Sequence, residues 1–312
     1  MAELSAAAPL PHADVALLTE RRYSASVAAA GDWYLGNILS DDNLLITALA
    51  ARGLSAVRID WARDDVDWSA FRVAVFRTTW DYFDRFAEFT AWLEQAEPLV
   101  GLCNPGPLVR WNLDKHYLRD LATRDVPVVP SRFLEQGQPA SLADLLRETG
   151  WSQAVVKPCV SGAARHTYRV DDSTADRVQG VLDPLLARES FLLQPFVADV
   201  VITGEDTLVA IAGRVTHGLR KQVKPGDFRV QDDHGGTVHA LEPTAEQVAL
   251  AERALAACDT LPAYGRVDMV RLHDGSLAVM ELELIEPELW LRLHPPAAEA
   301  LAAAVADAIS AP

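Results

Sequence analysis

The chain has 312 residues, of which 50% are hydrophobic and 23% charged, so it can bury a large core and is not globally disordered. Its 44 Asp and Glu residues outnumber 28 Lys and Arg residues, which gives a formal net charge of −16. This balance excludes the broad basic surface that nucleic acids and anionic membranes require, but a local basic cluster could still bind a phosphorylated small molecule.

The cysteine pattern and the N-terminal stretch indicate the cellular compartment. Cys103, Cys159 and Cys258 form no CxxC pair and no metal-ligand spacing, so a disulfide framework is not expected and a reducing cytoplasm is predicted. The N-terminus lacks a basic segment followed by a long apolar core, so no signal peptide is expected. No apolar run approaches the ~20 residues that span a bilayer.

The first third of the chain alternates strand-like and helix-like segments. Short apolar runs predict buried strands, and an apolar stripe that ends near Gly53 predicts a helix. This order is typical of a parallel sheet flanked by helices. The predicted segments are a strand at 14–20, a helix at 41–53, strands at 55–61 and 73–82, and a helix at 86–96.

The pattern changes after about residue 105, where strands lie close enough in sequence for antiparallel pairing. The fold class is therefore α/β followed by α+β, with predicted domains at 1–105, 106–190 and 191–312. The predicted segments are a helix at 113–124, an extended stretch at 126–134, strands at 154–160 and 164–170, a helix at 176–188, a strand at 191–197, a strand pair at 207–221, and helices at 244–258 and 297–309.

A hairpin with unusual charge is predicted within VDMVRLHDGSLAVMELELIEPEL, residues 267–289. Asp274 and Gly275 favour a two-residue type I′ turn between two alternating strands. That turn would place Asp268 directly opposite Glu281, with Glu283 two residues further on the same face. The other face would carry Met280, Leu282 and Leu284.

Three clustered carboxylates need a compensating cation, because like charges opposite one another destabilise a sheet. Arg266, predicted to lie opposite Glu283, would supply part of it. A bound Mg²⁺ ion explains the three carboxylates better, since Mg²⁺ prefers carboxylate oxygens and completes its coordination with water and substrate phosphates. The alternative is the solvated acidic face of an ordinary hairpin.

A second segment, VVKPCVSGAARHTYRV, would supply groups that bind phosphate. Lys157 lies at a predicted strand end and is followed by a small-residue turn through Ser161 and Gly162. A lysine suits phosphate, and backbone N–H groups in such a turn can form an anion-binding nest. A plain hairpin turn remains the alternative here, and for Lys115 in WNLDKHYL the alternative is an ordinary surface lysine.

Residues 216–236 concentrate positive charge in this acidic chain, with Arg220, Lys221, Lys224 and Arg229 within ten residues. This segment is either a solvated basic loop or a part of an anion-binding site.

The segment RTTWDYFDRF follows a predicted strand of the first domain. Ligands of open α/β sheets bind at the carboxyl ends of the strands, so Arg77, Trp80, Asp81 and Tyr82 are candidate substrate residues. Their mix of charge and aromatic rings suits a small zwitterion such as an amino acid. An ordinary polar loop is the alternative.

Taken together and in this order, the motifs from about 105 to 295 resemble the ATP-grasp ligase superfamily, which includes D-alanine–D-alanine ligase and glutathione synthetase. The resemblance implies an ATP-grasp fold that clamps ATP, two Mg²⁺ ions with Mn²⁺ as an alternative, and a small amino-acid-like substrate. It is also compatible with a homodimer. The residues it assigns are Lys115 and Lys157 for the ATP phosphates, Ser161 to Arg165 with Gly162 for the phosphate loop, Gln194, Phe196 and Val197 for adenine, Glu205 for ribose, and Asp268, Glu281 and Glu283 for the metal.

Two features depart from the family pattern. The last metal ligand is usually Asn, whereas this chain has Glu283, and the phosphate loop is poor in glycine. The segment GDFRVQ matches the family's substrate and phosphate loop, which implies that Arg229 stabilises the negative transition state, with Arg220 and Lys221 as further catalytic candidates.

The resemblance implies activation of a carboxylate as an acyl phosphate, which a nitrogen nucleophile then attacks. The segments RTTWDY, WNLDKHYL and HGLRKQVKPGDFRVQ are similar to those of the D-cycloserine synthetase branch, which closes O-ureido-D-serine into a five-membered ring. Three alternatives remain: a dipeptide-type amino-acid ligase, a kinase-like enzyme that stops at a phosphorylated product, and an inactive nucleotide-binding module.

Overall fold

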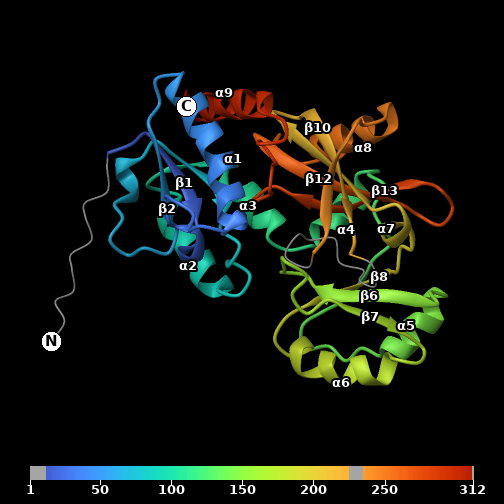
Figure 1. The fold of residues 1–312 in the computed structure, drawn as a ribbon. Coiled ribbons are helices and arrows are strands. Elements are labelled where there is room, and N and C mark those ends of the chain that lie inside the picture. Colours follow the sequence, from blue (N-terminus) through green and yellow to red (C-terminus); the bar gives the residue numbers. More distant parts are fainter. Residues whose placement is uncertain (1–11, 225–234, 311–312) are drawn as a thin grey trace. The chain divides into compact units, whose positions relative to one another are not determined.

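The computed structural model of the protein describes residues 12–224 and 235–310. The chain divides into two compact units, one made of Met1–Gly106 with Trp290–Pro312 and the other of Pro107–Leu289 (Figure 1). The boundary predicted near residue 105 falls at the end of the first unit. The C-terminal helix, predicted to belong to the last domain, instead packs with the first unit.

The boundary predicted near residue 190 lies inside the second unit. Strand β8 (Phe191–Pro195) follows that point, yet it pairs with β5 (Arg132–Leu134) and β6 (Gln153–Pro158), which precede it. A division there would separate strands of one sheet.

The first unit is a parallel sheet with the strand order β2-β1-β3-β4, as the alternation of strands and helices predicted. In the part that is described, its strands are β1 (Val15–Thr19), β2 (Ala56–Asp60), β3 (Val73–Thr78) and β4 (Gly101–Cys103), its helices are α1 (Trp33–Ala50), α2 (Phe86–Ala96) and α9 (Pro296–Ser310), and its 3₁₀ turns are η1 (Arg21–Tyr23) and η2 (Trp68–Ala70).

Helices cover both faces of this sheet. Phe76 of β3 packs against Phe89 and Trp92 of α2, at ring-centroid distances of 6.2 and 6.1 Å. The next residue, Arg77, bonds Asp42 of α1. Successive strand residues point to opposite faces, so α2 and α1 lie on opposite sides, and α9 packs beside α1.

Helix α1 begins at Trp33, well before the predicted start at residue 41. The Asp32 side chain caps it by accepting a hydrogen bond from the Leu35 N–H. The acidic residues Asp41 and Asp42, which looked like a helix start, are instead buried inside the helix and paired with arginines.

The second unit contains two antiparallel sheets, with strand orders β11-β10-β9-β12-β13 and β5-β8-β6-β7. Besides β5, β6 and β8, its described elements are α3 (Gly106–Asn112), α4 (Tyr117–Thr123), α5 (Leu142–Thr149), β7 (Tyr168–Asp171), α6 (Ala175–Leu186), α7 (Asp199–Ile202), β9 (Glu205–Ile211), β10 (Arg214–Gln222), β11 (Thr237–Leu241), α8 (Ala245–Ala256), β12 (Tyr264–Arg271) and β13 (Leu277–Glu283).

One face of the five-stranded sheet forms the main apolar core of this unit. Val267 and Met269 of β12 point into it, together with Leu282 of β13 and residues of α4 and α8. The neighbouring residues of each strand therefore face the other side of the sheet, where the candidate site lies. Helices α5 and α6 form a separate core against the four-stranded sheet.

The hairpin of β12 and β13 departs from its prediction. The Leu272 N–H bonds the Ser276 carbonyl, so the loop has three residues rather than two, with Gly275 at φ +82°. The register in which β12 pairs with β13 shifts by one residue between Asp268 and Met269. Met280 is therefore an extra residue in β13, with no partner in β12. This β-bulge restores the pairing of Asp268 with Glu281.

The bulge also changes the side on which one residue lies. Met280 was predicted to share a face with Leu282, but it packs in a small apolar cluster with Val270 and Ala278. It therefore lies on the carboxylate face, next to Glu281.

Side chains of the preceding helices hold the outer edge of β13. Asn112 of α3 donates to the Leu282 carbonyl and accepts from the Leu284 N–H, while the Tyr117 hydroxyl accepts from the Leu282 N–H. Val129 pairs with Val279 further along the strand. These contacts fix the position of the strand that carries Glu281 and Glu283.

Among the described residues, no helix combines the length and apolar character needed to cross a membrane.

Candidate active site

A buried ionic network centred on Asp268 occupies the polar face of the five-stranded sheet. Asp268 Oδ2 lies 2.8 Å from Lys221 Nζ and 3.0 Å from Arg266 Nη2, and Asp268 Oδ1 accepts from the Thr207 hydroxyl at 2.8 Å. Lys221 also bonds Glu205 at 2.5 Å. The two cations outweigh the effect of burial and hold the pKa of Asp268 far below its usual range, so this carboxyl is ionised.

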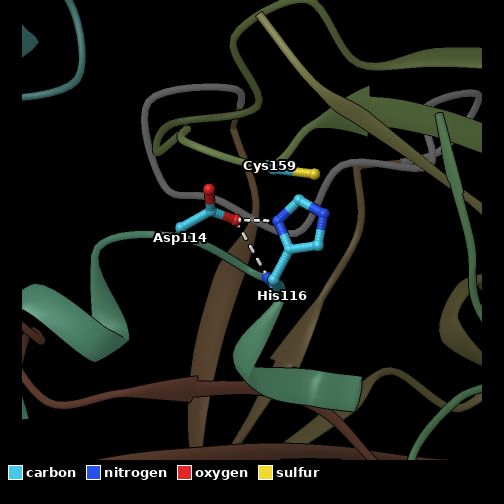
Figure 2. A group of neighbouring side chains, drawn as sticks. All are labelled: Asp114, His116 and Cys159. Carbon is cyan, nitrogen blue, oxygen red and sulfur yellow. Dashed lines mark hydrogen bonds and ion pairs between the residues drawn. The ribbon is translucent and has the colours of Figure 1, made fainter. Parts of the chain in front are cut away.

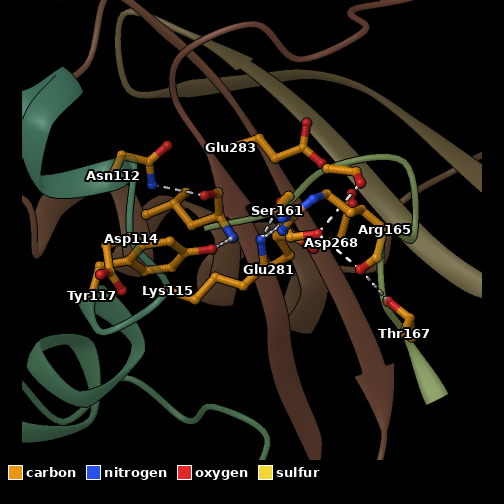
Figure 3. A network of polar contacts seen from close by, with 12 residues as sticks. Asn112, Asp114, Lys115, Tyr117, Ser161, Arg165, Thr167, Asp268, Glu281 and Glu283 are labelled. Atoms are coloured by element: carbon orange, nitrogen blue, oxygen red, sulfur yellow. Dashed lines mark hydrogen bonds and ion pairs between the residues drawn. The ribbon is translucent and has the colours of Figure 1, made fainter. Parts of the chain in front are cut away.

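Lys115 links this network to the phosphate loop predicted at 161–165. Its Nζ donates to the Ser161 carbonyl at 2.6 Å and lies 3.0 Å from Glu281 Oε1 (Figure 3). The Lys115 N–H also bonds the Cys159 carbonyl. Lys115 is 6% exposed, so the surface-lysine alternative does not apply.

Glu283 lies against Arg266, as the pairing of β12 with β13 predicted. Burial and the nearby carboxylates Asp268 and Glu281 outweigh that arginine and raise the pKa of Glu283 to about 7. Glu286 lies nearby, and its pKa is raised to about 8 by burial and by Glu283. Both carboxyls are therefore protonated more readily than exposed glutamates.

Lys157 lies at the end of β6 and differs from the other lysines of the site. Within the described residues, its ammonium is engaged by no hydrogen bond or ion pair. Burial and the charge of Lys115 lower its pKa, against the opposing effect of Glu281. A desolvated cation without an ionic partner is suited to an anionic ligand.

The segment after Lys157 adopts an unusual backbone for its sequence. Ala163, Ala164 and His166 have φ values of +47°, +55° and +47°, in the left-handed region that glycine normally occupies. Arg165 anchors the segment through two hydrogen bonds to Glu189, at 2.8 and 2.9 Å. The loop thus reaches a glycine-like conformation with few glycines.

The residues predicted to border adenine lie on and after β8. Val197 joins an apolar cluster with Val129, Val270 and Ala278, and Met280 packs against it. The Phe196 ring lies under the Arg169 guanidinium at 3.9 Å. The Gln194 side chain is buried and bonds Ser131.

The three predicted catalytic residues have different positions. Lys221 lies within the network, but Arg220 is bonded to Asp206, which in turn bonds Gln247 of α8. Consecutive residues of a strand face opposite sides, so Arg220 lies on the helix-covered face and does not join the site. Arg229 lies outside the described residues.

The four candidate substrate residues fall into two groups, two that are buried and two that are partly exposed. Arg77 is 3% exposed and paired with Asp42, while Tyr82 is 5% exposed and packs on Phe83 and Phe89. Both are part of the core, because Arg77 lies in the buried strand β3 against α1 and Tyr82, which follows the strand, packs against α2. Only Trp80 and Asp81 are partly exposed.

Carboxylates and aromatic rings gather at the carboxyl ends of the parallel strands in the first unit. Glu20, Asp60 and Asp81 follow or end β1, β2 and β3, and burial raises the pKa of Glu20 and of Asp60. The Trp80 ring contacts Tyr23 at 5.6 Å. Of these three strand ends, only the segment RTTWDYFDRF after β3 was predicted to contribute to a site, because the sequence does not show that Glu20 and Asp60 lie beside it.

The sequence did not single out three residues that position the site, Asn112, Tyr117 and Thr207. Thr207 is signalled only by its register opposite Asp268 on a neighbouring strand, and that pairing joins segments about sixty residues apart. Asn112 and Tyr117 contact backbone atoms, which leave no sequence pattern.

Comparisons with known proteins agree with this geometry. The family model described as D-cycloserine synthetase DcsG, N-terminal domain, matches residues 15–104. The cycloserine biosynthesis protein DcsG of Streptomyces lavendulae is 37% identical over 281 residues, which are 84% of this chain and 92% of that protein.

Solved structures give the same result. The crystal structure of D-cycloserine synthetase DcsG superposes with a TM-score of 0.80 at 33% identity, covering 95% of this chain and 99% of that one. D-alanine–D-alanine ligase from Bacillus anthracis has a TM-score of 0.64 at 17% identity, covering 96% and 97%, which shows the shared fold alone. The predicted fold class and superfamily are confirmed. The chain belongs to the DcsG family of ATP-grasp enzymes and is an ATP-dependent ligase.

Proposed function

We propose that this ligase transfers the γ-phosphoryl group of ATP to a carboxylate of a small amino-acid-like substrate, and that a nitrogen nucleophile then displaces phosphate from the acyl phosphate. The observation that carries this proposal is the half-buried Lys157, a cation without an ionic partner among the described residues, near the carboxylates Asp268 and Glu281. Such chemistry depends on positioning and charge neutralisation rather than on a nucleophilic side chain.

The ATP phosphates would bind Lys115, Lys157 and the backbone of the Ser161–Arg165 loop. Gly162 lies in this loop, and the consecutive left-handed residues after it favour a concave, anion-binding backbone. Lys221 would neutralise phosphate charge from β10. Arg229 keeps its proposed role at the transition state.

The nucleoside would bind at the end of β8 and the residues that follow it. Val197 and Met280 offer an apolar surface for adenine, Gln194 and Phe196 come from the same strand segment, and Glu205 would bind the ribose hydroxyls. Met280 was not among the predicted adenine residues.

Asp268, Glu281 and Glu283 would hold Mg²⁺, in two ions, with Mn²⁺ as the alternative. All their donor atoms are carboxylate oxygens, the ligands that Mg²⁺ prefers. When bound, the ions neutralise phosphate charge during transfer. Glu283 in place of Asn makes this set more anionic than in most relatives.

We further propose that the substrate is O-ureido-D-serine and that its own nitrogen closes the five-membered ring of D-cycloserine. The 37% identity to the Streptomyces protein supports this assignment. The carboxylates Glu20 and Asp81, together with the ring of Trp80, suit the ammonium group of such a substrate.

The test is ADP release with Mg-ATP across a panel of small amino acids that includes O-ureido-D-serine, with products identified by mass. Ring-closed product from that compound alone supports the full proposal. Condensed pairs of amino acids would indicate a dipeptide-type ligase, and product mass that retains phosphate would indicate a kinase. Nucleotide binding without turnover across the panel would contradict the proposed substrate.

A further inference from the structure

Three side chains with metal-binding atoms converge outside the carboxylate network. Asp114 and His116 come from the segment between α3 and α4, and Cys159 follows β6 (Figure 2). One carboxylate oxygen, one imidazole nitrogen and the thiol sulfur all lie within 4.8 Å of one another. His116 Nδ1 is 2.5 Å from Asp114 Oδ1, so a proton now lies between these two atoms.

This donor set differs in chemistry from the carboxylate network. Sulfur and imidazole nitrogen favour Zn²⁺ over Mg²⁺, which selects oxygen. Three protein ligands leave one coordination position for water. Cys159 is buried, whereas the Asp114 side chain is 42% exposed, so an ion can approach from the Asp114 side.

The imidazole is already held in the orientation that metal binding requires. Its ring stacks on Phe133 at 4.5 Å, and its second nitrogen, Nε2, lies 3.3 Å from Glu135 Oε2. Nε2 is buried, and within the described chain it lacks hydrogen-bond geometry in this state. Metal-binding histidines commonly donate their other N–H to a carboxylate.

Binding of an ion would change where the protons of these side chains lie. The ion takes the position of the proton between Asp114 and His116 Nδ1, that proton moves to Nε2, and the Cys159 thiol releases its own proton to water. The imidazole then carries its N–H at Nε2, facing Glu135. Every proton is accounted for, and no redox step is required.

We infer that Asp114, His116 and Cys159 form a binding site for one Zn²⁺ ion, with Glu135 as the residue that positions His116. The site is separate from the carboxylates proposed to hold Mg²⁺. Its two segments flank Lys115 and the start of the phosphate loop, so a bound ion would tie them together beyond the single Lys115–Cys159 backbone hydrogen bond.

The experiment titrates the full-length protein, stripped of metal and then supplied with excess Mg²⁺, with Zn²⁺ and in parallel with Co²⁺. The wild type is expected to bind one Zn²⁺ per chain, and Co²⁺ should give thiolate charge-transfer absorption in the near ultraviolet. Cys159→Ser should abolish that absorption. Both Cys159→Ser and His116→Gln should weaken Zn²⁺ binding by at least about tenfold, and Glu135→Gln by roughly tenfold with the absorption retained.

Two controls make the result specific. Cys258→Ser removes another buried thiol of the same unit and should leave the absorption intact. Glu281→Gln should also leave it intact, because that carboxylate belongs to the other cluster. Equal Zn²⁺ affinity in the wild type, Cys159→Ser and His116→Gln would overturn the inference, as would a Co²⁺ spectrum without thiolate absorption. His116→Gln keeps the test decisive if Cys159→Ser fails to fold.

Discussion

Asp268 on β12 lies directly opposite Glu281 on β13, although the loop that joins their strands has three residues and β13 contains an extra residue between Val279 and Glu281. The bulge at Met280 has two effects. It restores the facing position of the two carboxylates, and it adds an apolar side chain to the same face. The proposed metal ligands and the proposed adenine surface are thus adjacent because of one irregular residue.

Asp268→Asn should destabilise the protein strongly. The carboxylate is bonded to both Lys221 and Arg266, and a neutral amide leaves these buried cations undercompensated. We expect the free energy of unfolding, measured with urea, to fall by roughly 3 kcal/mol. Glu246→Gln breaks the exposed pair with Arg271 and should cost less than about 1 kcal/mol. Equal losses would mean that the network contributes no more than surface pairs.

Glu281→Gln should separate activity from stability. Glu281 is partly exposed and contacts one cation, Lys115, so the fold should remain intact. If it is a metal ligand, Mg²⁺-dependent turnover should fall by at least about a hundredfold. Turnover equal to that of the wild type would remove Glu281 from the metal site.

Lys157→Ala should weaken nucleotide binding without loss of stability. The ammonium is desolvated and its pKa is lowered, so its removal costs the free protein nothing, whereas a bound phosphate loses a charged hydrogen bond. ATP affinity, measured by calorimetry, should fall by roughly ten- to a hundredfold. Arg214→Ala, which removes a positive charge at an 82% exposed side chain, is the matched control and should leave affinity unchanged. Unaltered affinity in Lys157→Ala would contradict the phosphate role.

Met280→Ala tests the proposed adenine surface. The side chain packs with Val197 and Val270, and its truncation should weaken ATP binding by about fivefold, in line with roughly 1 kcal/mol for lost apolar contact. Inorganic triphosphate, which has no base, should bind the variant and the wild type equally. A similar loss for both ligands would show that the substitution disturbs the phosphate site instead.

Glu283 should make the stability of the metal-free protein depend on pH. Its folded-state pKa is raised from 4.5 to about 7, so between these values the folded chain binds more protons than the unfolded chain. The free energy of unfolding should therefore fall as the pH rises through this window. The difference between wild type and Glu283→Gln, measured in a chelator, reports the titration of Glu283 together with its effect on the raised pKa of Glu286. A difference that does not vary with pH would contradict the raised pKa.

Local patterns predicted most elements, and they singled out Lys115, Asp268 and Glu281, which the structure brings together. The alternating strands and the residues of FAEFTAWLEQA gave the strands and α2 closely, because their periodicity reflects burial directly. The pairing of Asp268 with Glu281 was also predicted correctly, but from a two-residue turn. Two errors, in the loop length and in the missing bulge, cancelled.

The remaining features depend on contacts between distant segments. Arg220 and Lys221 looked equivalent in the sequence, and only the strand's orientation distinguishes the residue at the site from the one bonded to Asp206. Arg77 resembled a ligand-binding residue because its buried partner, Asp42, lies in a helix 35 residues away. Cys159 had no metal-ligand spacing, since its neighbours Asp114 and His116 come from another element.

The hydrogen bonds from the side chains of Asn112 and Tyr117 to the backbone of β13 have a consequence for association between molecules. β13 is the last strand of its sheet, and an edge strand with open N–H and C=O groups invites a strand from another chain, by domain swapping or aggregation. Here the groups of Leu282 and the N–H of Leu284 are taken by side chains, and those of Val279 by the Pro127–Val129 segment. This part of the outer edge of β13 is therefore not available to pair with a strand of another molecule.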